Sequence, residues 1–259
     1  MREEHTSLAG TNRWEHAPGA QPRFHLTAPA PCPYLPGKTE RKLFTELGGP
    51  RAGELAETLG RQGFRRSQNF AYRPACDSCR ACVPVRIPVN EFHASASQRR
   101  LGRAHADLSA TVLPPWTTDE QYALLRRYLL DRHPDGGMSA MDGFDYADMV
   151  EQTRVDTRVI EYRQADGTLI AACITDVQDD GLSMIYSFYD AAHPARDGLG
   201  TWMILDHVAR ARAAQLDYVY LGFWIAGAPR MAYKSNFRPI EMLGSAGWER
   251  ASSAVTGGE

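Results

Sequence analysis

Three strand-like segments in the second half of the chain are the clearest feature of its hydrophobic pattern. They cover residues 156–163, 168–177 and 182–190, and each is rich in β-branched and aromatic residues. An Asp-Gly sequence separates the first two segments, and an Asp-Asp-Gly sequence separates the second two. Such sequences favour the tight turns of β-hairpins. The pattern therefore predicts an antiparallel meander of three strands.

A helix and a fourth strand are expected after this meander. Residues 201–215 carry Trp202, Leu205 and Val208 at helical spacing, and residues 218–225 form a short apolar run. A meander followed by a glycine-containing turn, a helix and a strand resembles the order of an N-acetyltransferase-type (GNAT-type) acyltransferase core. The predicted fold class is α+β or α/β, with this core joined to a cysteine-containing N-terminal region.

Residues 83–89 form a β-branched run that is interrupted by Pro84 and Pro88. Proline has no amide hydrogen to donate to a neighbouring strand, so within sheets it is found mainly at edges. We therefore expect an edge strand or a turn here. Upstream, residues 53–63 have the leucine spacing and the flanking glycines of a short helix.

The character of the sequence changes after residue 113, where we place a domain boundary. Thr117 and Glu120 have the spacing of a capping box and should begin the first helix of the second domain. The ends of the chain are polar and aperiodic, and we expect them to be tails. The predicted parts are residues 1–21 (tail), 22–113 (N-terminal cysteine-containing basic region), 114–250 (acyltransferase-like domain) and 251–259 (tail).

The overall composition is that of an ordinary globular protein. The 259 residues are 43% hydrophobic and 23% charged, with a formal net charge of -2. The N-terminal stretch lacks the basic and apolar regions of a signal peptide, and no apolar run is long enough to span a membrane. We expect a cytoplasmic protein with no membrane partner.

Residues 63–105 depart from this charge balance. They contain eight arginines and two acidic residues, so the segment is strongly basic and should meet an anionic partner. Ser95 and Ser97 are suited to cap a helix, and Arg99 and Arg100 would lie on its surface. Phosphate binding and simple solvation both fit such a helix.

Four of the five cysteines form a candidate ligand set. Cys76, Cys79 and Cys82 follow a C-x2-C-x2-C spacing within the basic segment, and Cys32 is the natural fourth partner. Without a secretion signal, a disulfide framework is not expected. Four thiolates fit a zinc site or an iron–sulfur cluster, and free thiols packed against a pocket fit the same spacing.

Longer stretches of the sequence match one known family in order. In the first half these are CPYLPG (32–37), GFRRSQNFAYRPACDSCRACVPVRI (63–87) and SQRR (97–100). In the second half they are FYDAAHP (188–194), LGTWMILDH (199–207), YVYLGFWI (218–225) and MAYKSNFRPIE (231–241). Over about residues 22–248 the chain resembles the arginyl-tRNA–protein transferase family, and within it the bacterial aspartate/glutamate leucyltransferase branch.

The resemblance implies transfer of leucine from leucyl-tRNA onto a protein N-terminal Asp or Glu, which marks that protein for N-end rule degradation. This reaction is the aminolysis of an aminoacyl ester, and it requires no cofactor. The implied partners are leucyl-tRNA as donor and proteins with an acidic N-terminal residue as acceptors. Asp190 and Tyr189, at the end of the third predicted strand, are candidates for orienting or deprotonating the attacking amine.

Binding residues follow from the chemistry of the two substrates. A side-chain carboxylate on the acceptor suits a bidentate arginine, and three arginines lie beside the cysteines. The phosphates of the tRNA acceptor end suit exposed cations. The acceptor candidates are Arg65, Arg66 and Arg73, and the tRNA candidates are Arg99, Arg100, Lys234 and Arg238.

Three other functions fit parts of the sequence. Arginyl transfer from arginyl-tRNA to the same N-termini is separated from leucyl transfer only by the branch resemblance. A zinc-dependent RNA-binding module without catalysis would account for the basic cysteine segment alone. A coenzyme A-dependent N-acetyltransferase is disfavoured, because Arg196 stands one residue too close to the glycine turn and Asp197 is negative where a pyrophosphate would bind. We therefore expect no coenzyme A.

Overall fold

The computed structural model describes residues 21–134 and 136–252. The predicted tails at 1–21 and 251–259 therefore lie almost wholly outside the described residues. Within the described part, no helix combines the length and the apolar character needed to cross a membrane.

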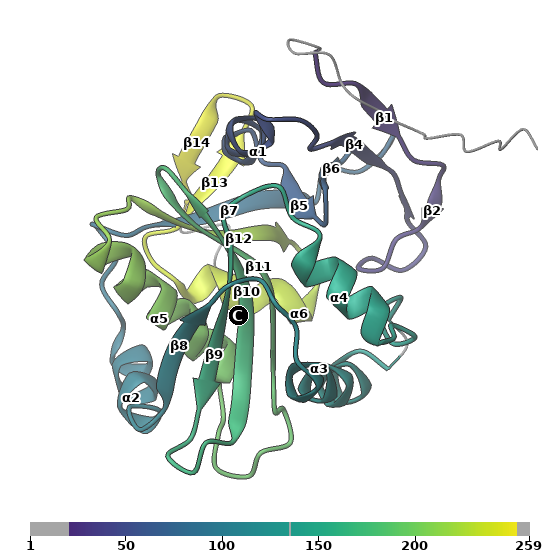
Figure 1. Cartoon of the computed structure of the whole chain (residues 1–259). Helices are drawn as coiled ribbons and strands as arrows, with labels where there is room; N and C mark the ends of the chain where they lie inside the picture. The colour runs from purple at the N-terminus through teal and green to yellow at the C-terminus, as the bar shows by residue number, and fades with distance from the viewer. Residues whose placement is uncertain (1–20, 135, 253–259) are drawn as a thin grey trace, which may run out of the picture.

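An eight-stranded sheet forms the centre of the protein, in the order β14-β13-β7-β12-β11-β10-β9-β8 (Figure 1). The predicted meander is confirmed, because β9, β10 and β11 pair antiparallel in sequence order. Strand β12 then lies parallel to β11. The strands are β7 (Cys82–Pro88), β8 (Ser109–Leu113), β9 (Thr157–Arg163), β10 (Leu169–Gln178), β11 (Gly181–Tyr189), β12 (Tyr218–Ile225), β13 (Glu241–Gly244) and β14 (Gly247–Arg250).

Helices cover both faces of this sheet (Figure 1). On one face, α5 (Leu199–Ala213) and α2 (Ala96–Ala104) pack over a core that includes Ile87, Trp202 and Val219. On the other face, α3 (Asp119–Arg132) and α4 (Gly143–Glu151) pack over a second core. The protein is thus a three-layer mixed α/β structure.

A smaller four-stranded sheet lies beside the large one, at the upper right of Figure 1. Its order is β1-β4-β6-β5, and α1 (Ala52–Arg61) packs with it around buried Leu47, Leu59 and Phe64. A two-stranded ribbon of β2 and β3 continues from it. The bounds of these strands are β1 (Phe24–Leu26), β2 (Ala30–Pro31), β3 (Thr39–Glu40), β4 (Lys42–Glu46), β5 (Arg65–Ser67) and β6 (Phe70–Pro74).

Two short helical elements follow β12 near the C-terminus. They are α6 (Pro229–Ala232) and a 3-10 turn, η1 (Tyr233–Asn236).

The prediction for residues 83–89 is wrong, because β7 lies inside the large sheet between β12 and β13. The reason lies in the limited reach of β13, which pairs only with Val85 and Arg86. Both prolines fall outside that short ladder, so this neighbour does not require their missing amide hydrogens. A proline-containing strand can therefore be central when one of its neighbours is short.

The helix starts were predicted to within one or two residues. Ser95 caps α2 and forms a capping box with Gln98, as the sequence indicated for this position. The box of α3 is displaced by one residue from the prediction, since Thr118 and Gln121 form it rather than Thr117 and Glu120. Thr117 instead donates through its hydroxyl to Glu151 at the end of α4.

The large sheet draws strands from both sides of the boundary that we placed at residue 113. Strands β7 and β8 come from the N-terminal region, and they flank a block of strands from the C-terminal domain. The small sheet ends with β6 at Pro74. At the level of sheets, the chain therefore divides between Pro74 and Cys82.

Candidate functional site

Strands β11 and β12 separate after a short parallel contact. Their pairing covers only Gly181, Leu182 and Ser183 of β11. Beyond this contact the register of β11 shifts against β10, and the register of β12 shifts against β7. We call the open part, residues 184–189 and 221–225, the splay. Backbone carbonyls that face a splay need hydrogen-bond donors from elsewhere in the chain.

Two cationic side chains donate to these carbonyls. The Nη2 atom of Arg65 donates to the carbonyl oxygens of Met184 (3.0 Å) and Ile185 (2.6 Å) on β11. The Nζ atom of Lys234 donates to Leu221 (2.8 Å) and Phe223 (2.7 Å) on β12. Since Arg65 comes from β5 and Lys234 from η1, segments far apart in sequence keep the splay open.

Gly222 on β12 leaves the room that Arg65 occupies. Its φ is +71°, and a Cβ atom at this position would lie 1.9 Å from Nη1 of Arg65. Burial, and the nearby Arg65, lower the pKa of Lys234 to about 7. The Lys234 amine therefore loses its proton far more readily than an ordinary lysine does.

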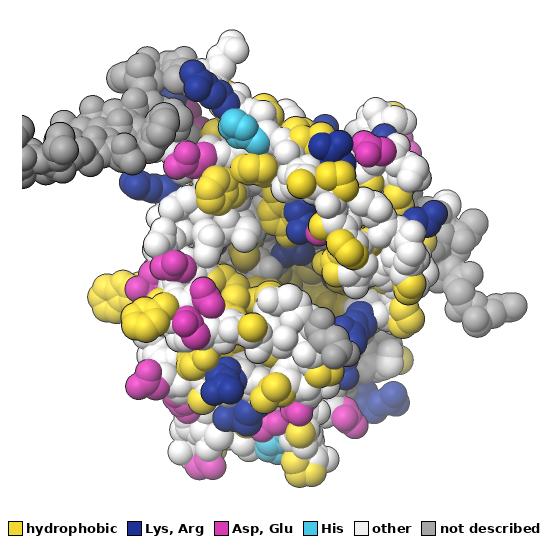
Figure 2. Space-filling view, turned by 90° about the vertical axis from the view of Figure 1, so that its right-hand side faces the viewer, with side chains coloured by type: hydrophobic (Ala, Val, Ile, Leu, Met, Phe, Trp, Pro, Cys, Tyr) yellow, Lys and Arg dark blue, Asp and Glu magenta, His cyan; other side chains and the backbone are white. Residues whose placement is uncertain are grey.

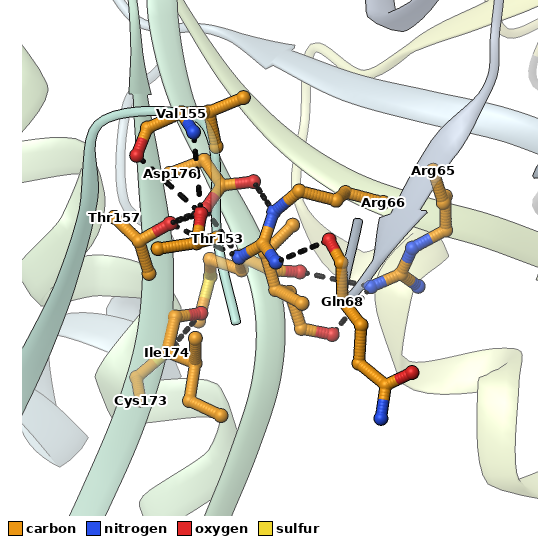
Figure 3. A network of polar contacts seen from close by, with 11 residues as sticks. Arg65, Arg66, Gln68, Thr153, Val155, Thr157, Cys173, Ile174 and Asp176 are labelled. Carbon is orange, nitrogen blue, oxygen red and sulfur yellow. Dashed lines mark hydrogen bonds and ion pairs between the residues drawn. The ribbon is translucent and has the colours of Figure 1, made fainter. Parts of the chain in front are cut away.

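Arg66, the neighbour of Arg65, points the other way and forms a buried ion pair (Figure 3). Its Nε and Nη2 atoms donate to the two carboxylate oxygens of Asp176 at 2.6 and 2.7 Å, and Nη2 also contacts Thr157. Arg73 lies with its guanidinium 5.0 Å from the ring centre of Phe64. Of the three arginines predicted for the acceptor, Arg66 thus already pairs with a carboxylate within the fold, and Arg65 uses its Nη2 atom on two backbone carbonyls.

Tyrosines from two elements, α3 and β11, gather beside the splay. The ring of Tyr128 on α3 lies 5.0 Å from that of Tyr189 and 6.5 Å from that of Tyr186. Burial, and then Tyr189, raise the pKa of Tyr128, so its hydroxyl stays protonated and can donate. The ring of Tyr189 also lies against Gly200 in the first turn of α5. This tyrosine therefore links β11, α3 and α5.

Asp190 follows Tyr189 at the exit of β11. Its carboxylate accepts from the backbone N–H of Ala192 (3.3 Å), and its own N–H donates to Ile170 (2.9 Å). The loop that follows is tied down by His105, whose Nε2 contacts the Asp197 carbonyl oxygen (2.8 Å), and by an ion pair of Arg196 with Asp107. The predicted pair Tyr189 and Asp190 thus sits where β11, the loop and α5 meet.

The four predicted cysteines line one pocket, which we call the cysteine pocket. It is open to solvent and lies where the small sheet and the β2–β3 ribbon meet β12. The other lining residues that matter here are Tyr34, Lys38, Glu40, Lys42, Tyr72, Phe223 and Ile225. The face shown in Figure 2 is hollowed near its centre, with basic and hydrophobic side chains around the hollow.

The zinc or iron–sulfur site considered for the four thiols stays a prediction. Over residues 21–134 and 136–252, no three His, Cys, Asp or Glu side chains are arranged so that they could hold a metal ion. Burial and the three neighbouring thiols raise the pKa of Cys82 to about 11, so it is a neutral thiol at pH 7. Cys82 therefore contributes an uncharged, polarisable side chain to the pocket.

The residues predicted to contact tRNA fall into two groups. Arg99, Arg100 and Arg238 are exposed, and the first two lie on α2, which packs beside α5. Lys234 is only 5% exposed and donates to two carbonyls. It does not reach the surface, so a direct phosphate contact is not available to it.

Several residues of the site carried no signal that we used in the sequence. Asp176 lies in an apolar run, and its partner Arg66 is 110 positions away. Glu40, Lys42 and Tyr128 belong to no predicted motif. One signal was present in the composition, because only three of the 29 Lys and Arg residues are lysines.

Taken together, the fold and the splay define a mixed α/β protein whose central sheet opens between two parallel strands. Two segments match models of one family: residues 30–100 match "Arginine-tRNA-protein transferase, N terminus", and residues 120–244 match its C terminus. The chain belongs to this arginine-tRNA-protein transferase family.

Named bacterial proteins are similar to this chain. The chain is 61% identical to the aspartate/glutamate leucyltransferase of Sphingopyxis alaskensis, over 90% of this chain and 93% of that protein. It is 58% identical to the protein of the same name from Rhizorhabdus wittichii, over 88% of both chains. Among solved structures, L-PGS from Bacillus licheniformis matches with a TM-score of 0.45 and 12% identity, over 57% of this chain and 46% of that chain.

Proposed function

We propose that this protein is a cytoplasmic aminoacyl-tRNA–protein transferase that moves leucine from leucyl-tRNA onto the N-terminal Asp or Glu of other proteins. Such a transfer marks the acceptor for N-end rule degradation. The observation that carries the proposal is the 61% identity, over nine-tenths of the chain, to a protein named aspartate/glutamate leucyltransferase. Family membership supports the reaction class independently of that name.

The topology supports a GNAT-type acyltransferase core. A meander (β9 to β11), a helix (α5) and a strand parallel to β11 (β12) follow one another in the predicted order. Strands β11 and β12 then separate at the splay. A splay between adjacent strands lets an acyl group and a nucleophile approach from opposite sides of a sheet. We therefore place the reaction at the exit of β11, beside Tyr189 and Asp190.

The reaction makes one bond and breaks one. The neutral α-amine of the acceptor attacks the ester carbonyl carbon of leucyl-tRNA, and a C–N bond forms. The ester C–O bond to the terminal ribose then breaks, and the proton lost by the nitrogen ends on the ribose hydroxyl. An α-amine with a pKa of about 8 is partly neutral at pH 7, so positioning and charge stabilisation are the main tasks of the enzyme.

Residues of this chain can carry out those tasks. The Asp190 carboxylate is a proton acceptor at a strand end, and we assign it to orienting or deprotonating the amine. Tyr189 packs against both Tyr128 and α5, so its position is fixed relative to the donor side. No cofactor is needed in this scheme.

The donor is expected along α5 and α2. Helix α5 starts at Gly198 without a side-chain cap, so its first N–H groups are available to a phosphate. Arg99 and Arg100 are exposed on the adjacent α2. Arg196, the basic residue of the glycine turn, is already paired with Asp107. A tRNA acceptor end fits this surface, and we propose no role for coenzyme A.

Transfer assays with charged tRNA test the proposal. The protein is incubated with tRNA carrying radiolabelled leucine or arginine and with peptides that begin with Asp, Glu or Ala. We expect leucine in the Asp and Glu peptides only. Arginine incorporation would support the arginyl alternative, which the description of the family favours. Binding of tRNA without any transfer would overturn the proposal in favour of an RNA-binding module.

A further inference from the structure

All three lysines of the chain lie at the splay or in the cysteine pocket. The chain uses arginine for almost all of its basic residues, and lysine only at positions 38, 42 and 234. Lys234 donates to the splay, while Lys38 and Lys42 line the cysteine pocket. An ammonium is a compact point charge with rotatable donors, whereas a guanidinium is a rigid planar fork. Lys38 and Lys42 thus place compact charges in the cysteine pocket, while the Lys234 amine donates to the splay.

The cysteine pocket holds both signs of charge. Lys42 and Glu40 form an ion pair with 3.1 Å between Nζ and Oε1, and Lys38 lines the same pocket. The side chains of Lys42 and Glu40 are 41% and 21% exposed, so both remain accessible to solvent. The arginines predicted for the acceptor do not line this pocket, and both cations that do are lysines.

The remaining walls are aromatic, aliphatic or thiol. Tyr34 and Tyr72 line the pocket together with the charged residues, and Phe223 and Ile225 of β12, which belong to the splay, line it as well. Apolar walls reduce the local dielectric screening and strengthen ion pairs formed inside. Because Lys234 holds the carbonyl of Phe223, this wall is fixed relative to the splay.

We infer that the cysteine pocket is the subsite for the acidic N-terminal residue of the acceptor. The inference rests on the proposed function and adds the acceptor position. Lys38 and Lys42 bind the side-chain carboxylate, and Glu40 attracts the charged α-ammonium group as the acceptor enters, before the amine loses its proton and reaches Asp190. A free N-terminal Asp or Glu carries these two opposite charges a few bonds apart, which matches the charges of the pocket. The Lys42–Glu40 ion pair is exchanged for two ion pairs to the acceptor.

The choice of lysine explains why two acids of different length are accepted. Asp and Glu differ by one methylene, so their carboxylates stop at different depths. A bidentate arginine is specific for one position and orientation of a carboxylate. Two flexible ammonium groups can follow the carboxylate to either position. The pocket therefore selects for charge and tolerates a difference in length.

The test uses Lys38→Met and Lys42→Met, singly and together, with leucyl-tRNA and peptides that begin with Asp, Glu, Asn or Gln. We expect the double variant to lose on the order of 30-fold or more in kcat/KM for Asp and Glu peptides. Its affinity for leucyl-tRNA should change less than about threefold. Arg154→Met, an exposed cation on the loop before β9, is the matched control and should behave as wild type.

A binding measurement keeps the inference testable if transfer is slow. Titration of an Asp peptide into wild type should show tighter binding than its N-acetylated form, and Glu40→Gln should remove that difference. Two failures are distinguishable. If wild type transfers no leucine to any peptide, the proposed function is wrong. If wild type transfers leucine and the double variant still prefers Asp to Asn as wild type does, the subsite is not the cysteine pocket.

Discussion

Arg66 and Asp176, 110 positions apart in the sequence, form a two-point ion pair inside the protein. The side chains are 4% and 6% exposed, and the pair joins β5 of the small sheet to β10 of the large one. The hydroxyl of Thr157 donates to the same carboxylate at 2.8 Å. This contact fixes the position of β5 and hence of Arg65, which holds the splay.

The ion pair predicts a stability defect rather than a change of selectivity for Arg66→Ala. Removing the guanidinium leaves a buried carboxylate without its partner, which typically costs about 3–5 kcal/mol. Urea unfolding measures this loss. The double variant Arg66→Met, Asp176→Leu removes both charges and should recover much of it. If Arg66→Ala unfolds like wild type but loses its preference for Asp peptides, Arg66 contacts the acceptor after all.

Gly222→Ala should lower the free energy of unfolding more than an alanine substitution at a left-handed glycine with open space around it. The added Cβ meets Arg65, so the guanidinium has to move and give up its carbonyl contacts. Gly167→Ala is the matched control, because its φ is +87° and nothing lies within 4 Å of the new Cβ. A left-handed alanine alone costs about 1–2 kcal/mol. Equal losses of unfolding free energy in the two variants would contradict a clash with Arg65.

The lowered pKa of Lys234 gives a pH-dependent prediction. Between about pH 7 and the ordinary lysine value of 10.5, the unfolded chain holds this proton and the folded protein does not. The contribution of Lys234 to the free energy of unfolding therefore rises with pH over this window, by at most about 1.4 kcal/mol per pH unit. Relative to Lys234→Met, wild type should become steadily more stable from pH 7 to pH 9 in urea unfolding. If the free energies of unfolding of wild type and Lys234→Met change equally with pH, the folded protein keeps the proton.

Asp190→Asn should distinguish the role of this side chain in the turn from its role in the transfer reaction. An asparagine oxygen can still accept from the Ala192 N–H, so the loop and the melting temperature should be unchanged. The amide has no basicity, so we expect a strong decrease in the single-turnover rate of transfer. A rate within about threefold of wild type, under roughly 0.7 kcal/mol, would remove Asp190 from the mechanism.

Replacing Arg99 and Arg100 with alanine tests the predicted tRNA face. Each lost phosphate contact should reduce the slope of log affinity against log salt by about 0.7 to 0.9. The control is the double alanine variant of Arg126 and Arg127, which are exposed on α3 across the sheet. Equal slopes for wild type and the α2 variant would mean that these arginines only solvate the helix.

The sequence by itself determined the elements whose signals are local. The meander, helix α5 and strand β12 follow from periodicity and turn residues, and the α2 cap follows from Ser95. Such signals depend on residues a few positions apart. The family was also readable, because several segments match it in order.

Only the tertiary structure decided which side chains are available to substrates. Nothing near Arg66 indicates that Asp176 will neutralise it, and nothing near Lys234 indicates that two carbonyls of β12 will bury its amine. The central position of β7 likewise depends on how far β13 reaches along it. The physical reason is the same in each case. Whether a charged group is free or already satisfied depends on partners that long-range pairing brings near, and a linear pattern does not contain those distances.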